Sequence, residues 1–243
     1  MALTARVRRL HRFLGAVIGL QILLWTASGI YFVWTDIDEI RGDHLRAPVT
    51  SIAFDADWTS PGAIDFEGAA LDRPSAVLGL RLIDLAGVPH YRLRFVDASG
   101  TERIALADAR TGTIREPLNR DEAVALAKRS FAPAADVLDV ARLTDGDVGA
   151  HHEYRGRPLP AWRVRFAHDS RTSVYVSADE GTVATHRNGR WRIFDALWML
   201  HTMDYGSRDD FNNPWIRAVS LLALAVTVTG YLMWYRTRPK KRR

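Results

Sequence analysis

The sequence predicts an α+β protein whose globular part lies between two transmembrane helices. Three observations support this prediction: an uncharged apolar stretch near each end, an uneven distribution of charge, and an internal repeat of alternating residues in the middle. Of the 243 residues, 47% are hydrophobic and 25% are charged, which is typical of a folded protein. The chain has no cysteine, so disulfides, iron–sulfur clusters and covalently attached c-type haem are excluded.

The two apolar stretches are long enough to cross a membrane. Residues 13–35 contain 23 residues without a charge, and residues 218–235 contain 18. As helices they would be about 34 Å and about 27 Å long, against a hydrocarbon core of ~30 Å. Asn213 and Pro214 suit the N-cap and first turn of the second helix. The alternatives are a cleaved signal peptide for the first stretch and a buried core helix for the second.

The distribution of charge predicts the orientation of the chain. Residues 1–12 carry four arginines and residues 236–243 carry six basic residues, with no acid in either segment. All 28 acidic residues lie within residues 36–213, together with 22 of the 33 basic residues. By the positive-inside rule both termini are cytoplasmic and the middle is periplasmic, in a bacterial inner membrane. Because the excess of basic residues belongs to the ends, we expect no nucleic-acid partner.

The middle of the chain contains a repeat, residues 91–114 and 162–183. Five consecutive residues at the start of each copy match at an offset of 71, and both copies close in a glycine turn, at Gly112 and Gly181. Each copy alternates apolar and polar residues, breaks at a turn and alternates again. This pattern predicts an antiparallel meander with one solvent-exposed face. The two glycines suit left-handed turns.

Helices and further strands are expected before each copy. Residues 119–131 have acids at the start, bases at the end and apolar side chains on one side, which predicts a helix, and a strand follows at 140–143. A weaker helix is expected at 63–71, and a strand at 77–83. Each unit therefore combines one helix with an antiparallel sheet, and the helix covers one face of that sheet.

This order of elements and three stretches of sequence resemble the PepSY-associated transmembrane proteins. The stretches are RRLHRFLGAVIGLQILLWTASGIYF, the repeat copy WRVRF…VYVSADEGTV, and LWMLHTMDYGSRDDFNNPWIRA. The resemblance implies two PepSY-like units, a domain type linked to extracytoplasmic binding and to peptidase propeptides. Larger members have about four spans and are linked to ferric-siderophore reduction, with haem b held by membrane histidines. This chain has two spans.

With this resemblance the expected organisation runs through the whole chain. It comprises a basic arm (1–12), a first transmembrane helix (13–35), two PepSY-like units (36–118 and 119–189), an interfacial helix with a connector (190–212), a second transmembrane helix (213–235) and a basic tail (236–243).

His11 and His201 are the candidate axial ligands for haem b, because imidazole is the usual ligand of that cofactor. His11 shares its helix face with a stripe of small residues, Gly15, Gly19, Thr26 and Gly29. His201 lies in an aromatic helix expected at the outer membrane surface. The two histidines would be ~30 Å apart, too far to bind one iron, so a homodimer would supply the second ligand of each site. In the alternative, both histidines are ordinary residues of the membrane interface with no ligand role.

Two other groups of residues suggest binding. Arg92, Arg94, Arg163 and Arg165 are expected on one face of the two meanders, where they would hold an anionic ligand such as a siderophore or a peptide carboxylate. The alternative is that they pair with Asp or Glu on an exposed face. The run His151-His152-Glu153 has no third metal ligand at a recognised spacing and is expected in a solvated loop. No nucleotide-binding or flavin-binding motif is present.

Together these features predict a haem-b-binding electron-transfer or accessory component of the inner membrane, linked to iron acquisition. The competing prediction is a non-redox periplasmic module that docks a peptide, a peptidase or another envelope partner. In both cases the expected partners are the lipid bilayer and a second copy of the chain or a larger membrane complex.

Overall fold

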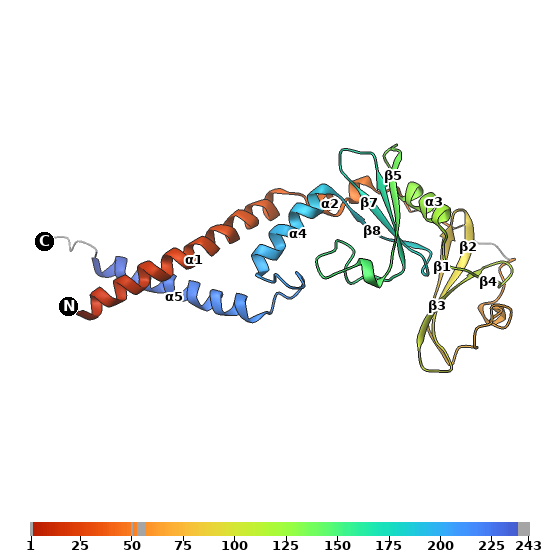
Figure 1. The fold of residues 1–243 in the computed structure, drawn as a ribbon, viewed down its shortest axis with the longest axis horizontal. Coiled ribbons are helices and arrows are strands. Elements are labelled where there is room, and N and C mark those ends of the chain that lie inside the picture. Colours follow the sequence, from red (N-terminus) through yellow and green to blue (C-terminus); the bar gives the residue numbers. More distant parts are fainter. Residues whose placement is uncertain (1, 50, 53–56, 238–243) are drawn as a thin grey trace. The chain divides into compact units, whose positions relative to one another are not determined.

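The computed structural model describes residues 2–49, 51–52 and 57–237 (Figure 1). It combines helices with two antiparallel sheets, which confirms the α+β prediction. The chain divides into two compact units. The helical unit comprises Met1–Ile37 and Arg192–Arg243, and the sheet unit comprises Asp38–Trp191.

Two long helices of the helical unit have the length and composition of membrane spans. They are α1, Ala2–Trp34, and α5, Pro214–Thr237, and the candidate spans within them are Arg8–Trp34 and Pro214–Thr237. Only 11% of the most apolar window of α1 and 0% of that of α5 is buried inside the protein. The core helix of a soluble domain would be mostly buried, so these exposed apolar surfaces favour contact with lipid.

The ends of these helices differ slightly from the prediction. Because α1 begins at Ala2, the basic arm expected at 1–12 is a helical continuation of the span. At the other end α5 reaches Thr237, and residues 238–243 of the predicted basic tail lie outside the described residues. The predicted start of α5 is confirmed, since the side-chain oxygen of Asn213 accepts the backbone N–H of Ile216 at 3.1 Å.

One face of α1, with residues spaced alternately three and four apart, packs against the antiparallel helix α5 near His11 and against α4 from Gln21 to Phe32. The less exposed residues of α1 on this face are His11, Leu14, Ile18, Gln21, Trp25, Ser28 and Phe32. A Cβ added to Gly15 would lie 4.0 Å from Val226, whereas one added to Gly19 or Gly29 would have nothing within 4 Å. The predicted stripe of small residues is therefore only partly used in this helix pair.

The sheet unit contains two four-stranded antiparallel sheets with the same strand order, β1-β2-β3-β4 and β5-β6-β7-β8. Their strands are β1 (Ala76–Leu85), β2 (Val88–Val96), β3 (Glu102–Asp108), β4 (Ile114–Arg115), β5 (Val137–Leu143), β6 (Ala161–Phe166), β7 (Ser173–Ser177) and β8 (Thr182–Arg187). In both sheets the register shifts at the same place, opposite Phe95 in β2 and opposite its repeat equivalent Phe166 in β6. The internal repeat thus extends from the sequence to the register of the strands.

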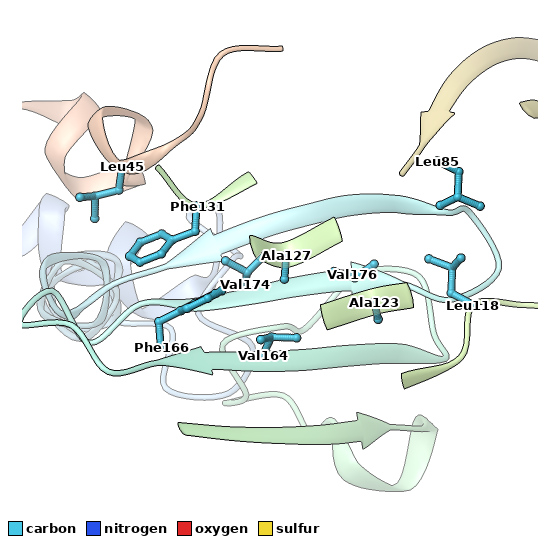
Figure 2. Close-up of a cluster of buried hydrophobic side chains, with 10 residues drawn as sticks. All are labelled: Leu45, Leu85, Leu118, Ala123, Ala127, Phe131, Val164, Phe166, Val174 and Val176. Atoms are coloured by element: carbon cyan, nitrogen blue, oxygen red, sulfur yellow. The ribbon is translucent and has the colours of Figure 1, made fainter. Parts of the chain in front are cut away.

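Helix α3, Arg120–Ser130, covers one face of the second sheet, close to its predicted range. Its start is fixed by Asn119, whose side-chain oxygen accepts the N–H groups of Asp121 and Glu122. The Glu122 carboxylate in turn accepts the N–H of Asn119. Figure 2 shows the core beneath it, in which Phe131 stacks on Phe166 with ring centroids 4.5 Å apart. The other residues of this buried cluster are Leu45, Leu85, Leu118, Ala123, Ala127, Val164, Val174 and Val176.

Two details of the predicted units are wrong. Residues 63–71 do not form a helix: a 3-10 turn, Pro61–Ala63, is followed by turns in which Asp65 accepts the N–H of Gly68 and itself donates to the Gly112 carbonyl. These hydrogen bonds, one of them to the turn at Gly112, take the place of the hydrogen bonds of a helix. The segment still covers the face of the first sheet where the helix was expected. The second sheet does not have a solvent-exposed face at β7, whose five residues are all buried.

The reason for that second difference is a segment that packs on the outer face of the second sheet. Tyr154 is fully buried there and stacks on Tyr175 of β7, with centroids 4.8 Å apart.

The predicted left-handed glycine turns are confirmed, with φ of +75° at Gly112 and +63° at Gly181. The backbone of the repeat was therefore predictable, but not the segments that cover it.

Candidate functional site

His201 lies in an aromatic cluster within the helical unit. It belongs to α4, Gly189–Thr202, and its ring is nearly parallel to that of Trp198, at 6.4 Å and 9°. Two rings of α1 lie close to it, Trp25 at 6.1 Å and Phe32 at 5.6 Å. The aromatic stripe expected at the membrane surface thus packs against α1 and fixes the plane of the imidazole.

A hydroxyl group lies beside one ring nitrogen of His201. The Ser28 hydroxyl lies 2.8 Å from Nδ1 of His201 and 2.8 Å from the carbonyl oxygen of Leu24. A hydroxyl has one proton and the carbonyl only accepts, so when Ser28 donates to Leu24 it accepts from Nδ1–H of His201. In the neutral imidazole the lone pair is then on Nε2, which has no hydrogen-bond partner among the described residues.

The connector after α4 holds His201 in place. Asn213 donates to the carbonyl oxygens of Thr202, at 2.9 Å, and Asp210, at 2.8 Å, while capping α5, so it joins the end of one helix to the start of the next. The buried Asp195 forms an ion pair with Arg208 at 2.6 Å.

Asp204 organises the turn between these two anchors. Its carboxylate accepts the backbone N–H groups of Gly206, Ser207, Asp209 and Asp210. The Ser207 hydroxyl and these amides hold the pKa of Asp204 well below its usual range. The turn therefore keeps its negative charge, and with it these hydrogen bonds, at any physiological pH.

His11 lies near the opposite end of α1 and shows the same hydrogen-bond pattern. Its Nδ1 is 2.9 Å from the hydroxyl of Thr229, which also lies 2.7 Å from the carbonyl oxygen of Ala225. When Thr229 donates to that carbonyl it accepts Nδ1–H, and the lone pair of a neutral imidazole at His11 is then on Nε2. A Cβ on Gly230 would lie 3.4 Å from the His11 ring, so this glycine gives the imidazole room against α5.

The two histidine sites are separate. His11 contacts α5 at Thr229, and His201 contacts α1 at Ser28, 17 residues further along the helix. At 1.5 Å per residue this separation is about 26 Å. Each site has a single imidazole from this chain, and no group of three or more metal-ligating side chains occurs in residues 2–49, 51–52 and 57–237.

The four candidate arginines lie in the sheet unit, and three of them form ion pairs. Arg92 pairs with Glu180 at 2.9 Å, Arg94 with Glu102 at 2.5 Å, and Arg163 with Asp139 at 2.9 Å. Arg165 is exposed and has no ion pair within the described part of the chain. Three of these side chains therefore balance acidic neighbours, and the binding of an anion stays a prediction.

The run His151-His152-Glu153 lies in the segment that covers the second sheet. There the Glu153 carboxylate accepts the Tyr175 hydroxyl at 2.5 Å, and Nδ1 of His152 accepts the N–H of Tyr154 at 3.0 Å. Both side chains therefore make structural hydrogen bonds within this segment.

The sequence analysis missed the hydroxyl partners of both histidines. Ser28 and Thr229 are separated from His201 and His11 by 173 and 218 residues, and no local pattern links residues so far apart. A usable signal was present for Ser28, because alternate steps of three and four from His11 along α1 arrive at it.

Comparison with known proteins supports a membrane assignment. The family model described as PepSY-associated TM region matches residues 2–237. No curated protein and no solved structure matches this chain. The match includes both apolar helices and everything between them, so this chain belongs to the family of PepSY-associated transmembrane proteins and is a membrane protein.

Proposed function

We propose that this protein is a haem-b-binding component of membrane electron transfer, an accessory to iron acquisition, with His11 and His201 as axial ligands. The observation that carries the proposal is the shared pattern of the two histidines. In each, a hydroxyl of a neighbouring helix lies within hydrogen-bond distance of Nδ1, and Nε2 has no partner among the described residues. Histidines that bind metals are oriented in this way, through a hydrogen bond from the other ring nitrogen.

We propose a haem at each site, with one ligand from each chain. Imidazole Nε2 is a suitable axial ligand, and the aromatic rings around His201 provide an apolar environment for a macrocycle. A six-coordinate iron needs a second ligand, and we propose that a second copy of the chain supplies it at both sites. Bound haem b would exchange single electrons between a donor and an acceptor.

The chain's own residues have distinct roles in this proposal. Ser28 and Thr229 hold the imidazole tautomer, and Trp198 fixes the plane of the His201 ring. Asn213 and the Asp195–Arg208 ion pair hold the end of α4 against the start of α5. The link to iron acquisition comes from the resemblance to the larger haem-binding members of the family.

The proposed location is the bacterial inner membrane, with both termini in the cytoplasm and the sheet unit in the periplasm. The support is the excess of basic residues at both ends and the confinement of all 28 acids to residues 36–213. Alkaline phosphatase and fluorescent-protein fusions at Asp145 test this topology. An inactive phosphatase together with a fluorescent reporter would contradict it.

Absorption spectroscopy tests the function directly. The full-length protein is expressed with added haem precursor, purified in detergent, and measured oxidised and dithionite-reduced. We expect a Soret band and a reduced α-band, with His11→Ala and His201→Ala each removing about half of the bound haem and the double variant removing all of it. His168→Ala, in the sheet unit, is the matched control and should retain full occupancy. A wild-type protein without a Soret band would refute the proposal.

The hydroxyl groups supply a second, more specific test. Ser28→Ala and Thr229→Val remove only the acceptors of the Nδ1–H bonds, and loss of such outer-shell partners typically weakens metal affinity by about 10–100-fold. Thr227→Val is the control, because the Thr227 hydroxyl is exposed and bonds only its own helix, at Ala223. Equal haem affinity in all three variants would show that the hydroxyls do not orient the ligands.

A further inference from the structure

One edge of the first sheet is left open beside β4. The N–H of Asp108 bonds the carbonyl of Thr113, on the β4 side, whereas the N–H of Ala109 bonds Pro89, on the β2 side. Because alternate residues of an antiparallel strand direct their backbone groups to the same side, those of Ile104 and Glu102 also point toward the β4 side. The ladder of β4 reaches only Leu106, so no described strand lies opposite Ile104 and Glu102.

Proline ends this ladder. Leu106 pairs with Arg115, so the next residue in register, opposite Ile104, would be Pro117. Proline has no N–H to donate to the Ile104 carbonyl. The chain then leaves the sheet, because the N–H of Leu118 donates to the Ala178 carbonyl at 2.9 Å. The open edge is therefore built into the sequence at Pro117.

A groove runs along this open edge. It has a volume of about 430 Å³. One wall is formed by residues 68–71, the other by β3, β4 and Pro117, and Asp179 also lines it. The walls contribute apolar side chains, among them Leu71 and Ile104. The groove thus places unpaired strand groups next to apolar surface.

The charged side chains of the groove that form no ion pair within the described residues are acidic. The guanidinium of Arg115 is held by both carboxylate oxygens of Glu122 at 2.6 Å. Among the described residues neither Glu116 nor Asp179 forms an ion pair or a side-chain hydrogen bond, and the basic residue whose charge acts on Asp179 is Arg142 of β5. Burial raises the pKa of Asp179, Arg142 opposes this effect, and Glu180 adds to it. A cation beside Asp179 would relieve this cost of burial.

We propose that this groove binds an extended, basic peptide segment of a partner protein, which adds a strand to the edge of β3. The peptide backbone would bond the N–H and C=O groups of Ile104, alternate side chains would contact Leu71 and Ile104, and a Lys or Arg would lie beside Glu116 and Asp179. Strand addition of this kind derives affinity from main-chain bonds and selectivity from alternate side chains. The site lies wholly in the sheet unit and does not depend on haem.

Fluorescence anisotropy with defined peptides tests this proposal. The probe is a labelled heptapeptide of alternating valine and lysine, titrated with the full chain in a non-ionic detergent, with empty micelles as the blank. Peptides with glutamate or serine in place of lysine are the comparisons. We expect the lysine peptide to bind at least tenfold more tightly than the glutamate peptide, with affinity falling as salt rises.

Variants locate the binding. Glu116→Lys should weaken binding of the lysine peptide at least tenfold, while Asp169→Lys, the same change of charge at an exposed turn outside the groove, should leave it within twofold. Ile104→Pro removes the outward N–H, which an edge strand tolerates, and should weaken all three peptides. The haem-ligand variants His11→Ala and His201→Ala should bind normally, so failure of the haem proposal would not affect this one.

Hydrogen–deuterium exchange gives the decisive measurement. The amides of Glu102 and Ile104 should exchange quickly in the free protein and slowly with the lysine peptide bound. Protection that appears at the β1 edge instead, equal binding of the lysine and glutamate peptides, or no binding of any peptide would each overturn the proposal.

Discussion

Protonation of His186 should make the stability of the sheet unit depend on pH. His186 belongs to β8 and is only 1% exposed. Its Nε2 lies 2.8 Å from the Ser130 hydroxyl, and its Nδ1 is buried without a partner. Burial lowers the pKa of His186 from 6.5 to about 4; the charge of Arg46 adds to this effect and Asp43 opposes it. A proton on this ring would therefore be poorly accommodated in the folded protein.

The sign and size of the effect follow from this pKa. Above pH 6.5 the ring is neutral in both the folded and the unfolded chain, so pH has no effect through His186. Between pH 6.5 and 4 the unfolded chain takes up the proton and the folded chain does not. The free energy of unfolding therefore decreases as the pH is lowered through this range. At pH 5 the loss is about 2 kcal/mol, because each pH unit contributes about 1.36 kcal/mol. Below pH 4 it levels off.

Thermal unfolding of the full chain in detergent, followed by circular dichroism at pH 7 and pH 5, measures this loss. For a unit of about 150 residues, about 2 kcal/mol corresponds to a fall in Tm of about 4–8 °C. His186→Gln does not titrate and should remove most of this difference. His44→Gln, at an exposed histidine, should retain it. If His186→Gln shows the same fall in Tm as the wild type, His186 is not its cause.

The remaining predictions concern stability and are checked by the same melting experiment at pH 7. Gly112→Ala should cost about 1–3 kcal/mol, because its φ of +75° disfavours a side chain and the new Cβ would lie 2.9 Å from the Ala63 carbonyl oxygen; an unchanged Tm would mean that the 3-10 turn moves freely. Asn119→Ala should cost about 1 kcal/mol through loss of the capping box of α3, and a neutral result would show that tertiary packing alone holds the start of that helix. Phe166→Ala should cost about 3–5 kcal/mol, since the ring is 3% exposed and stacked on Phe131, whereas Leu138→Ala, at a side chain 61% exposed, should cost less than about 0.5 kcal/mol. Similar losses for these two variants would contradict the core assignment.

Features that depend on neighbouring residues were predictable from the sequence. The apolar stretches, the acid-to-base gradient of α3, the Asn213 cap and the glycine turns are all local, since the residues that cause them are adjacent to those they affect. The strand meander followed from alternation alone, and its repetition at an offset of 71 predicted two similar sheets.

The segments that cover each face came only from the tertiary structure. Residues 63–71 have some helical character, but Asp65 bonds the turn at Gly112 instead, and this choice depends on a strand far along the chain. The alternation in β7 indicates which side chains share a face, but not that Tyr154 packs against them. The candidate site shows the same division.

The two candidate histidines were chosen from the sequence by residue type and position, whereas the hydroxyls beside them lie 173 and 218 residues away along the chain. The periodicity of a chain records the direction in which each side chain points. Which residue that side chain contacts depends on how segments far apart in the sequence pack against one another. This packing is determined by the whole fold.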